Sequence, residues 1–174
     1  IISSDMGLNI SQRNITVSTC GIVPKIRELA DEGLSITLAL SLHAPNDEIR
    51  KTIMPVANKY ALKDVISACD YYFKKTGRRV SYEYSLVAGI NDNIKEAMNL
   101  VKLVNGRNIH INLIPVNPIK ERDFKQSDKL KIKEFKDFLE RKGVNATVRR
   151  EMGRDIEGAC GQLRRRFIQS ERNS

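Results

Sequence analysis

The sequence alternates short β-rich runs with amphipathic segments of helical period, and this alternation constrains the fold more than any other feature. Strands are expected at residues 14–21, 36–42, 80–87, 110–115 and 145–150. Helices are expected at residues 22–32, 62–76, 94–105 and 127–142, with a short helix capped by Asn46 and Asp47. Strands that alternate with helices through short connections pair in parallel, with the helices outside the sheet. The pattern therefore predicts an α/β fold, either an open doubly wound sheet or most of a barrel.

Two of the expected helices also predict which side chains face the core. The segment 62–76 stops at Gly77, and its inward stripe is expected to comprise Val65, Ile66, Cys69, Tyr72 and Phe73. The segment 127–142 is expected to start at Ser127. Its inward stripe is expected to comprise Leu130, Phe135, Phe138 and Leu139. Cys69 is thereby predicted to be a core residue.

Polar or reactive residues follow several of the expected strands, where parallel sheets collect their active residues. They are Ser18, Thr19 and Cys20 after the first strand, Ser41, Leu42 and His43 after the second, Asn117 after the fourth and Cys160 after the last. We expect these residues to line one rim of the sheet. His43 is a base, a ligand or, more commonly, a polar residue satisfied at a strand end. Asn117 is a turn residue or a group that recognises a polar ligand.

Cys160 lies in the glycine-rich stretch 151–163, where small neighbours leave its sulfur accessible. Arginines flank this stretch on both sides, and nearby positive charge favours the thiolate, which is the form that attacks or ligates. An inert, half-buried cysteine is the competing interpretation. Cys20, Cys69 and Cys160 make neither a zinc pattern nor a disulfide framework, which suits a reducing cytoplasm.

The charge predicts a polyanionic partner. The net charge is +9 and the pI is about 9.6, and most of the surplus lies in residues 119–174. The cluster of Arg164, Arg165 and Arg166 fits nucleic acid, whereas charge on segment 127–142 is explained equally by a solvated helix face. No run approaches the ~18 apolar residues of a membrane helix, and no secretory signal opens the chain. The chain begins at Ile1 without a Met, so we expect a piece of a longer protein. We also expect this protein to be cytoplasmic and monomeric.

Four motifs occur together and carry a family resemblance. Residues 16–19, 41–47, 112–118 and 155–163 read TVST, SLHAPND, NLIPVNP and DIEGACGQL. They resemble the radical S-adenosylmethionine (SAM) RNA methyltransferases of the RlmN/Cfr type across essentially the whole chain. The second and third motifs favour the branch that methylates C2 of adenine in 23S rRNA and tRNA over the branch that methylates C8. The sequence contains no dinucleotide-binding or phosphate-loop motif that would favour a different family.

The resemblance implies a partial β/α barrel of the radical SAM type whose N-terminal part is missing from residues 1–174. It implies that SAM is bound by Ser18, Ser41, Leu42, His43 and Asn117, and that Cys160, in a C-terminal loop over residues 151–163, carries the methyl group. The family's CxxxCxxC motif is absent from the sequence, so the ligands of its [4Fe-4S] cluster are expected upstream. The chain alone is therefore expected to hold no metal and to be inactive.

The resemblance also implies why a thiol is needed, because adenine C2 has no lone pair with which to attack a sulfonium methyl. One SAM methylates Cys160, and a second, cleaved at the cluster, gives a radical that takes hydrogen from the S-methyl group before its carbon adds to adenine. An upstream cysteine releases the product through a disulfide with Cys160. The implied partners are 23S rRNA, tRNA and an electron donor such as flavodoxin or ferredoxin.

Other functions stay open on the residues alone. A basic RNA-binding module without catalysis explains the charge. A metabolic β/α-barrel enzyme that acts on a phosphorylated small molecule explains the rim. Within the family, methylation of adenine C8 is the alternative.

Overall fold

Five parallel strands form one sheet in chain order, β1-β2-β3-β4-β5. The computed structural model describes residues 1–116 and 124–149 of the 174-residue chain. The strands are β1 Thr16–Thr19, β2 Thr37–Ser41, β3 Val80–Leu86, β4 Ile109–Pro115 and β5 Ala146–Val148. The order never reverses, and right-handed crossovers that always advance in one direction place their helices on one face. This topology excludes the doubly wound alternative and confirms the predicted partial β/α barrel.

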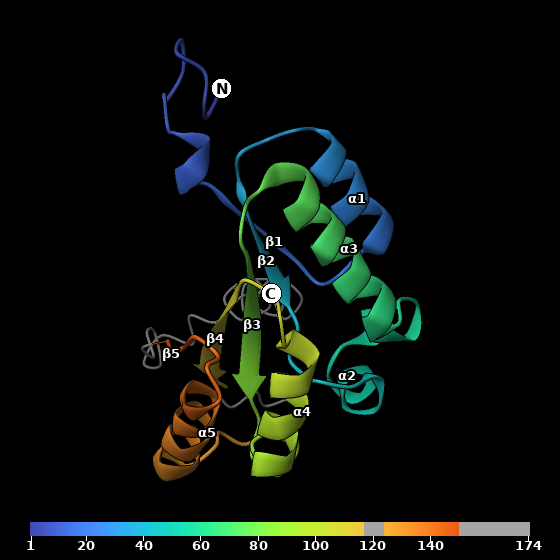
Figure 1. Cartoon of the computed structure of the whole chain (residues 1–174), viewed down its shortest axis with the longest axis vertical. Helices are drawn as coiled ribbons and strands as arrows, with labels where there is room; N and C mark the ends of the chain where they lie inside the picture. Colours follow the sequence, from blue (N-terminus) through green and yellow to red (C-terminus); the bar gives the residue numbers. More distant parts are fainter. Residues whose placement is uncertain (117–123, 150–174) are drawn as a thin grey trace, which may run out of the picture.

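The helices cover the outer face of this sheet in pairs. They are α1 Val23–Asp31, α2 Asp47–Ile53, α3 Leu62–Thr76, α4 Ile94–Val104 and α5 Lys129–Arg141, with short 3-10 turns η1 Gln12–Asn14 and η2 Pro55–Asn58. Helix α1 packs beside α3, and α4 packs beside α5 (Figure 1). No helix in the described ranges combines the length and apolar character needed to cross a membrane.

The two faces of the sheet differ in polarity. In β3, Val80, Tyr82, Tyr84 and Leu86 are buried in the core beneath the helices, whereas the alternating residues are only half-buried. We call the face opposite the helices the inner face. By strand register it carries Thr16, Ser18, Thr37, Ala39, Ser41, Ser81, Glu83, Ser85, His110, Asn112, Ile114 and Thr147. A polar inner face is typical of a barrel that encloses a ligand site, because its side chains point toward the barrel axis.

Local start and stop signals explain why the helix bounds agree closely with the sequence predictions. Helix α3 ends at Gly77, which adopts the left-handed conformation with φ of 63° that glycine tolerates best. Helix α2 begins after Asn46, whose side chain accepts a hydrogen bond from the Ile49 N–H. The Asn46 amide also donates to Glu96 Oε2 at 3.0 Å, and so links the start of α2 to α4.

Three predictions about the helices were wrong, one about where a helix starts and two about which side chains are buried. Helix α5 is capped by Asp128, not Ser127, which is buried beside it. Leu130 is 70% exposed because it lies about 140° around α5 from the buried Phe135, and Ile132 takes its place in the core. Phe73 is 38% exposed because it lines the opening of a pocket beside α3.

The double role of Asn46 gives the first prediction. Replacing Asn46 with Ala removes the cap of α2 and the bond to Glu96, so we expect the free energy of unfolding to fall by about 1–2 kcal/mol. Urea denaturation measures the change. Replacing the exposed Asn58 with Ala serves as the control and should change the value by less than about 0.5 kcal/mol. Equal effects at the two positions would contradict the assignment.

Candidate functional site

A pocket of about 480 Å³ lies at the carboxyl ends of the strands. Cys20 after β1, His43 after β2, Ser85 near the end of β3 and Val116 after β4 all line it. The segment 53–56 that connects α2 to η2 forms an apolar wall. Of the residues predicted to line one rim, Cys20 and His43 line this pocket. Asn117 and Cys160 lie outside the described residues.

The turn after β2 is fixed to β3 by one carbonyl group. Glu83 O accepts hydrogen bonds from the N–H groups of Leu42 at 2.9 Å and of His43 at 3.2 Å. His43 adopts a φ of 58°, in the left-handed region that is uncommon for residues other than glycine. These bonds hold that conformation and set the direction of the imidazole.

The surroundings of His43 define its chemistry. Its Nδ1 accepts a hydrogen bond from the Ser85 N–H at 3.0 Å, so the proton of the neutral ring resides on Nε2. Burial, helped by the nearby Arg50 cation, lowers the pKa of His43 to about 4. At neutral pH His43 is therefore an uncharged donor whose ring lines the pocket, rather than a general base.

Arg50 joins the ends of β1 and β2, a role that no sequence pattern indicated. Its side chain is fully buried, with Nη2 donating to Cys20 O at 2.7 Å and Nε donating to Leu42 O at 3.2 Å. Burial lowers the pKa of Arg50 from its usual value, yet a guanidinium retains its proton at neutral pH. Its Nη1 has no hydrogen-bond partner within the described residues. The rim therefore contains a positive charge that is shared by two carbonyl groups.

Asn91 makes the corresponding connection between β2 and β3, although its position in the sequence predicts only a turn. It is fully buried, and its Oδ1 accepts from the Val87 N–H at 2.7 Å. Its Nδ2 donates to His43 O at 2.8 Å and to Ser85 O at 2.7 Å. Both N–H groups and the oxygen of the amide thereby have hydrogen-bond partners in the two segments that Asn91 joins. The only sequence signal is the Asn-Asp pair that follows Gly89.

The remaining predicted residues occupy different environments. Ser18 is exposed on β1, and Ser41 is half-buried at the end of β2, both on the inner face. The Leu42 side chain lies in the hydrophobic core, which leaves only its backbone near the rim. The structure thus brings Ser41 and His43 together at one strand end and places Ser18 on the neighbouring strand.

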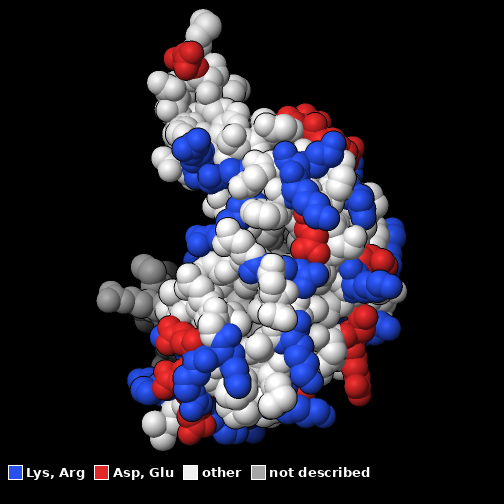
Figure 2. Space-filling view, viewed as in Figure 1, with Lys and Arg blue, Asp and Glu red and all other residues white. Residues whose placement is uncertain are grey.

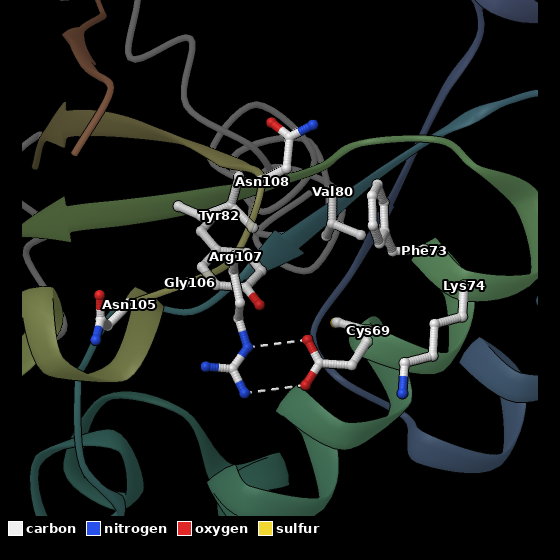
Figure 3. Close-up of a pocket in the computed structure, with 11 residues that line it drawn as sticks. Cys69, Phe73, Lys74, Val80, Tyr82, Asn105, Gly106, Arg107 and Asn108 are labelled. Carbon is white, nitrogen blue, oxygen red and sulfur yellow. Dashed lines mark hydrogen bonds and ion pairs between the residues drawn. The ribbon is translucent and has the colours of Figure 1, made fainter. Parts of the chain in front are cut away.

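A second pocket, of about 360 Å³, opens on the outer side of the sheet between α3 and the loop before β4 (Figure 3). Arg107 bridges this opening, with Nε and Nη2 donating to the two carboxylate oxygens of Asp70 at 2.9 and 3.0 Å. Cys69 lines the pocket but is 1% exposed, and burial raises the pKa of its thiol to about 12. Cys69 is therefore an unreactive core residue, as predicted.

Neither surface charge nor metal-ligating side chains mark a further site within the described ranges. On the face shown in Figure 2, Lys and Arg side chains are interspersed with Asp and Glu. Over residues 1–116 and 124–149, no three His, Cys, Asp or Glu side chains gather as a metal site. The arginine cluster at 164–166 lies outside these ranges.

The lowered pKa of His43 predicts a pH-dependent stability. An unfolded histidine has a pKa near 6.5, so between about pH 6.5 and 4 the unfolded chain binds the proton that the folded ring does not. The contribution of the neutral ring to the free energy of unfolding is fully present above this pH window. It is lost as the pH falls through the window, and the loss is about 3 kcal/mol. Urea denaturation at several pH values measures this loss. His43→Gln should remove it, whereas His110→Gln should preserve it; an unchanged profile in His43→Gln would show the assignment to be wrong.

The burial of Arg50 predicts a large cost of substitution. Arg50→Met leaves two buried carbonyl groups without a donor, so we expect the free energy of unfolding to fall by about 2–4 kcal/mol. The neighbouring Lys51 is exposed on the same helix, and Lys51→Met is the matched control with an expected change within about 0.5 kcal/mol. Chemical denaturation distinguishes the two, and similar losses would argue against the tie between β1 and β2.

Comparisons with known proteins agree with this geometry. No family model matches the chain. Two curated relatives are described as "Probable dual-specificity RNA methyltransferase RlmN": that of Lachnospira eligens is 62% identical over 169 residues, and that of Lachnoclostridium phytofermentans is 67% identical over 167 residues. The alignments cover 97% and 96% of this chain. The chain spans about half the length of these relatives, 48% and 47% respectively.

Solved structures show the same relationship. A radical SAM methyltransferase from Sphaerobacter thermophilus matches with a TM-score of 0.89 and 43% identity, over 93% of this chain and 48% of that one. A domain of the pyruvate-formate lyase-activating enzyme from Bacteroides vulgatus matches with a TM-score of 0.59 at 16% identity, a likeness of fold alone. By sequence the chain is similar to the C-terminal half of proteins described as RlmN RNA methyltransferases, and by fold it is similar to a radical SAM methyltransferase.

Proposed function

We propose that this chain is the C-terminal half of an RNA methyltransferase that methylates C2 of adenine in 23S rRNA and tRNA by radical SAM chemistry. The names of the curated relatives support the RNA methyltransferase activity. The observation in the structure that carries the proposal is the rim, where residues after four successive strands line one pocket beside a polar inner face. This arrangement fits a small polar cofactor held across the carboxyl ends of parallel strands.

The free edge of β1 supports the proposal that an N-terminal half completes the barrel. β1 pairs only with β2 in the described part of the chain, and Thr16, Val17 and Ser18 are exposed along it. An edge strand presents unpaired N–H and C=O groups that bind a further strand. We place the cluster ligands and the second active-site cysteine in that half, because the family resemblance implies a CxxxCxxC motif and the three cysteines of residues 1–174 do not have that spacing.

The chemistry of the rim fits SAM, whose carboxylate, ammonium and ribose groups need both donors and acceptors. The neutral His43 offers Nε2–H as a donor, and the hydroxyl groups of Ser18 and Ser41 can donate or accept. Leu42 contributes through its backbone, because its side chain is in the core. When bound, SAM supplies the methyl group and, with a [4Fe-4S] cluster, the radical chemistry of the family.

The roles of the undescribed residues rest on the family resemblance. We propose that Asn117 binds SAM, that Cys160 carries the methyl group, and that a disulfide between Cys160 and an upstream cysteine releases the product. We further propose a monomeric cytoplasmic enzyme that takes electrons from flavodoxin or ferredoxin. Within this scheme the apolar wall of the pocket at residues 53–56 excludes water from the reacting groups.

The methyl-carrier role is tested by mass spectrometry of the full-length protein, purified anaerobically with its upstream releasing cysteine replaced so that the intermediate is trapped. We expect the Cys160 peptide to gain about 14 Da, the mass that one methyl group adds. The Cys69 peptide provides an internal control that should remain unmodified, since its thiol is buried and protonated.

Two further measurements separate the alternatives. Cys160→Ala should abolish RNA methylation, whereas Cys69→Ala should retain it. Nucleoside analysis of the modified RNA should give 2-methyladenosine; 8-methyladenosine would assign the other branch of the family. An unmodified Cys160 in protein that still binds RNA would leave a binding module as the function.

A further inference from the structure

We propose that Glu83 forms an anionic subsite of the cofactor pocket and recognises the positive charge of SAM. The inference rests on the proposed function, but it concerns a residue that neither the four motifs nor the comparisons single out. Its basis is the position of Glu83 on the inner face, the hydrogen bonds that orient its carboxylate, and the lack of an ion-pair partner for it among the described residues.

Glu83 lies on the inner face of the sheet, close in sequence to the part of β3 that lines the pocket. Register pairs it with Ser41 on β2 and with Asn112 on β4, so its side chain shares the inner face with both. Its backbone carbonyl holds the turn of Leu42 and His43. Glu83 also lies two residues before Ser85, which lines the pocket and donates to the His43 ring. Any ligand that contacts Ser41 and His43 therefore passes close to this carboxylate.

A chain of hydrogen bonds across three strands fixes the carboxylate. Asn112 Nδ2 donates to Glu83 Oε1 at 2.8 Å, and Thr147 Oγ1 donates to Asn112 Oδ1 at 3.0 Å. Because the Thr147 hydroxyl has donated its only proton, it accepts from His110 Nε2 at 2.9 Å. Every donor in the chain points toward Glu83. The network thus preorganises a negatively charged acceptor rather than neutralising it.

The described surroundings supply no cation for this charge. No ion pair within residues 1–116 and 124–149 includes Glu83, and its inner-face neighbours Ser41, Ser81 and Ser85 are uncharged. A half-buried carboxylate without a counter-ion favours a positively charged partner, because removal from water strengthens their attraction. SAM carries a sulfonium and an ammonium group, whereas 5′-methylthioadenosine has the same nucleoside and no positive charge.

The test compares the affinities of the two ligands in the full-length protein. Glu83→Gln keeps an oxygen that accepts from Asn112 but removes the charge, so SAM should bind roughly 10- to 100-fold more weakly. Binding of 5′-methylthioadenosine should change less than about 2-fold, since it makes no charge contact. Glu134→Gln, on the exposed face of α5, is the matched control and should leave both affinities unchanged. Isothermal titration gives the affinities, and thermal unfolding shows whether each variant folds.

The outcomes separate the subsite from the proposed function. Unchanged SAM binding in Glu83→Gln, or an equal loss for both ligands, would overturn the charge recognition. If that variant does not fold, the wild-type protein still decides through S-adenosylhomocysteine, which keeps the amino-acid group of SAM but not the sulfonium charge. Equal affinities for SAM and S-adenosylhomocysteine would refute the subsite, and a preference of about 10-fold or more for SAM supports it. A wild-type protein that binds neither ligand would instead refute the proposed function itself.

Discussion

The arrangement of the strand ends depends on the buried guanidinium of Arg50. A charge removed from water costs several kcal/mol unless hydrogen bonds replace its hydration. Arg50 recovers that cost by donating to the carbonyl groups of Cys20 and Leu42, which stand at the ends of neighbouring parallel strands. No carboxylate neutralises it among the described ion pairs. The same cation therefore joins β1 to β2 and helps to keep the His43 ring uncharged. One side chain sets both the shape and the electrostatics of the rim.

The neighbouring connection, from β2 to β3, uses polar groups in the same manner. The Glu83 carbonyl holds the turn after β2, and the Asn91 amide joins that turn to the end of β3. Loops that follow parallel strands have no partner strand of their own, so their polar groups must be satisfied by such buried side chains. The result is a rigid base for a pocket whose opposite wall is apolar. Rigid placement of this kind lets a binding site keep its geometry without a ligand.

The sequence predicted the elements well because their signals are local. Gly77 ends α3 and Asn46 begins α2 for reasons that lie within one helical turn. The errors at Leu130 and Phe73 arose because apolar character does not reveal which part of a helix its neighbours cover. Arg50, Asn91 and Glu83 were missed because their partners lie on other strands and loops, at distances in sequence that no local pattern encodes. His43 was singled out by its position after a strand, but its tautomer required Ser85. The roles of Asn117 and Cys160 stay predictions.

The strands lie in the sheet in the same order as in the chain, and this order affects how the protein folds during synthesis. Each strand from β2 to β5 pairs with the strand that precedes it in the chain, so one partner of that strand has already been synthesised when it emerges. A nascent chain emerging from the ribosome can add β3 to the pair β1–β2, then β4, then β5, with a helix covering the outer face at each addition. Contacts between sequential elements also shorten the loops that must close, which lowers the entropic barrier to assembly. The sheet is therefore suited to vectorial, cotranslational folding from its N-terminal edge.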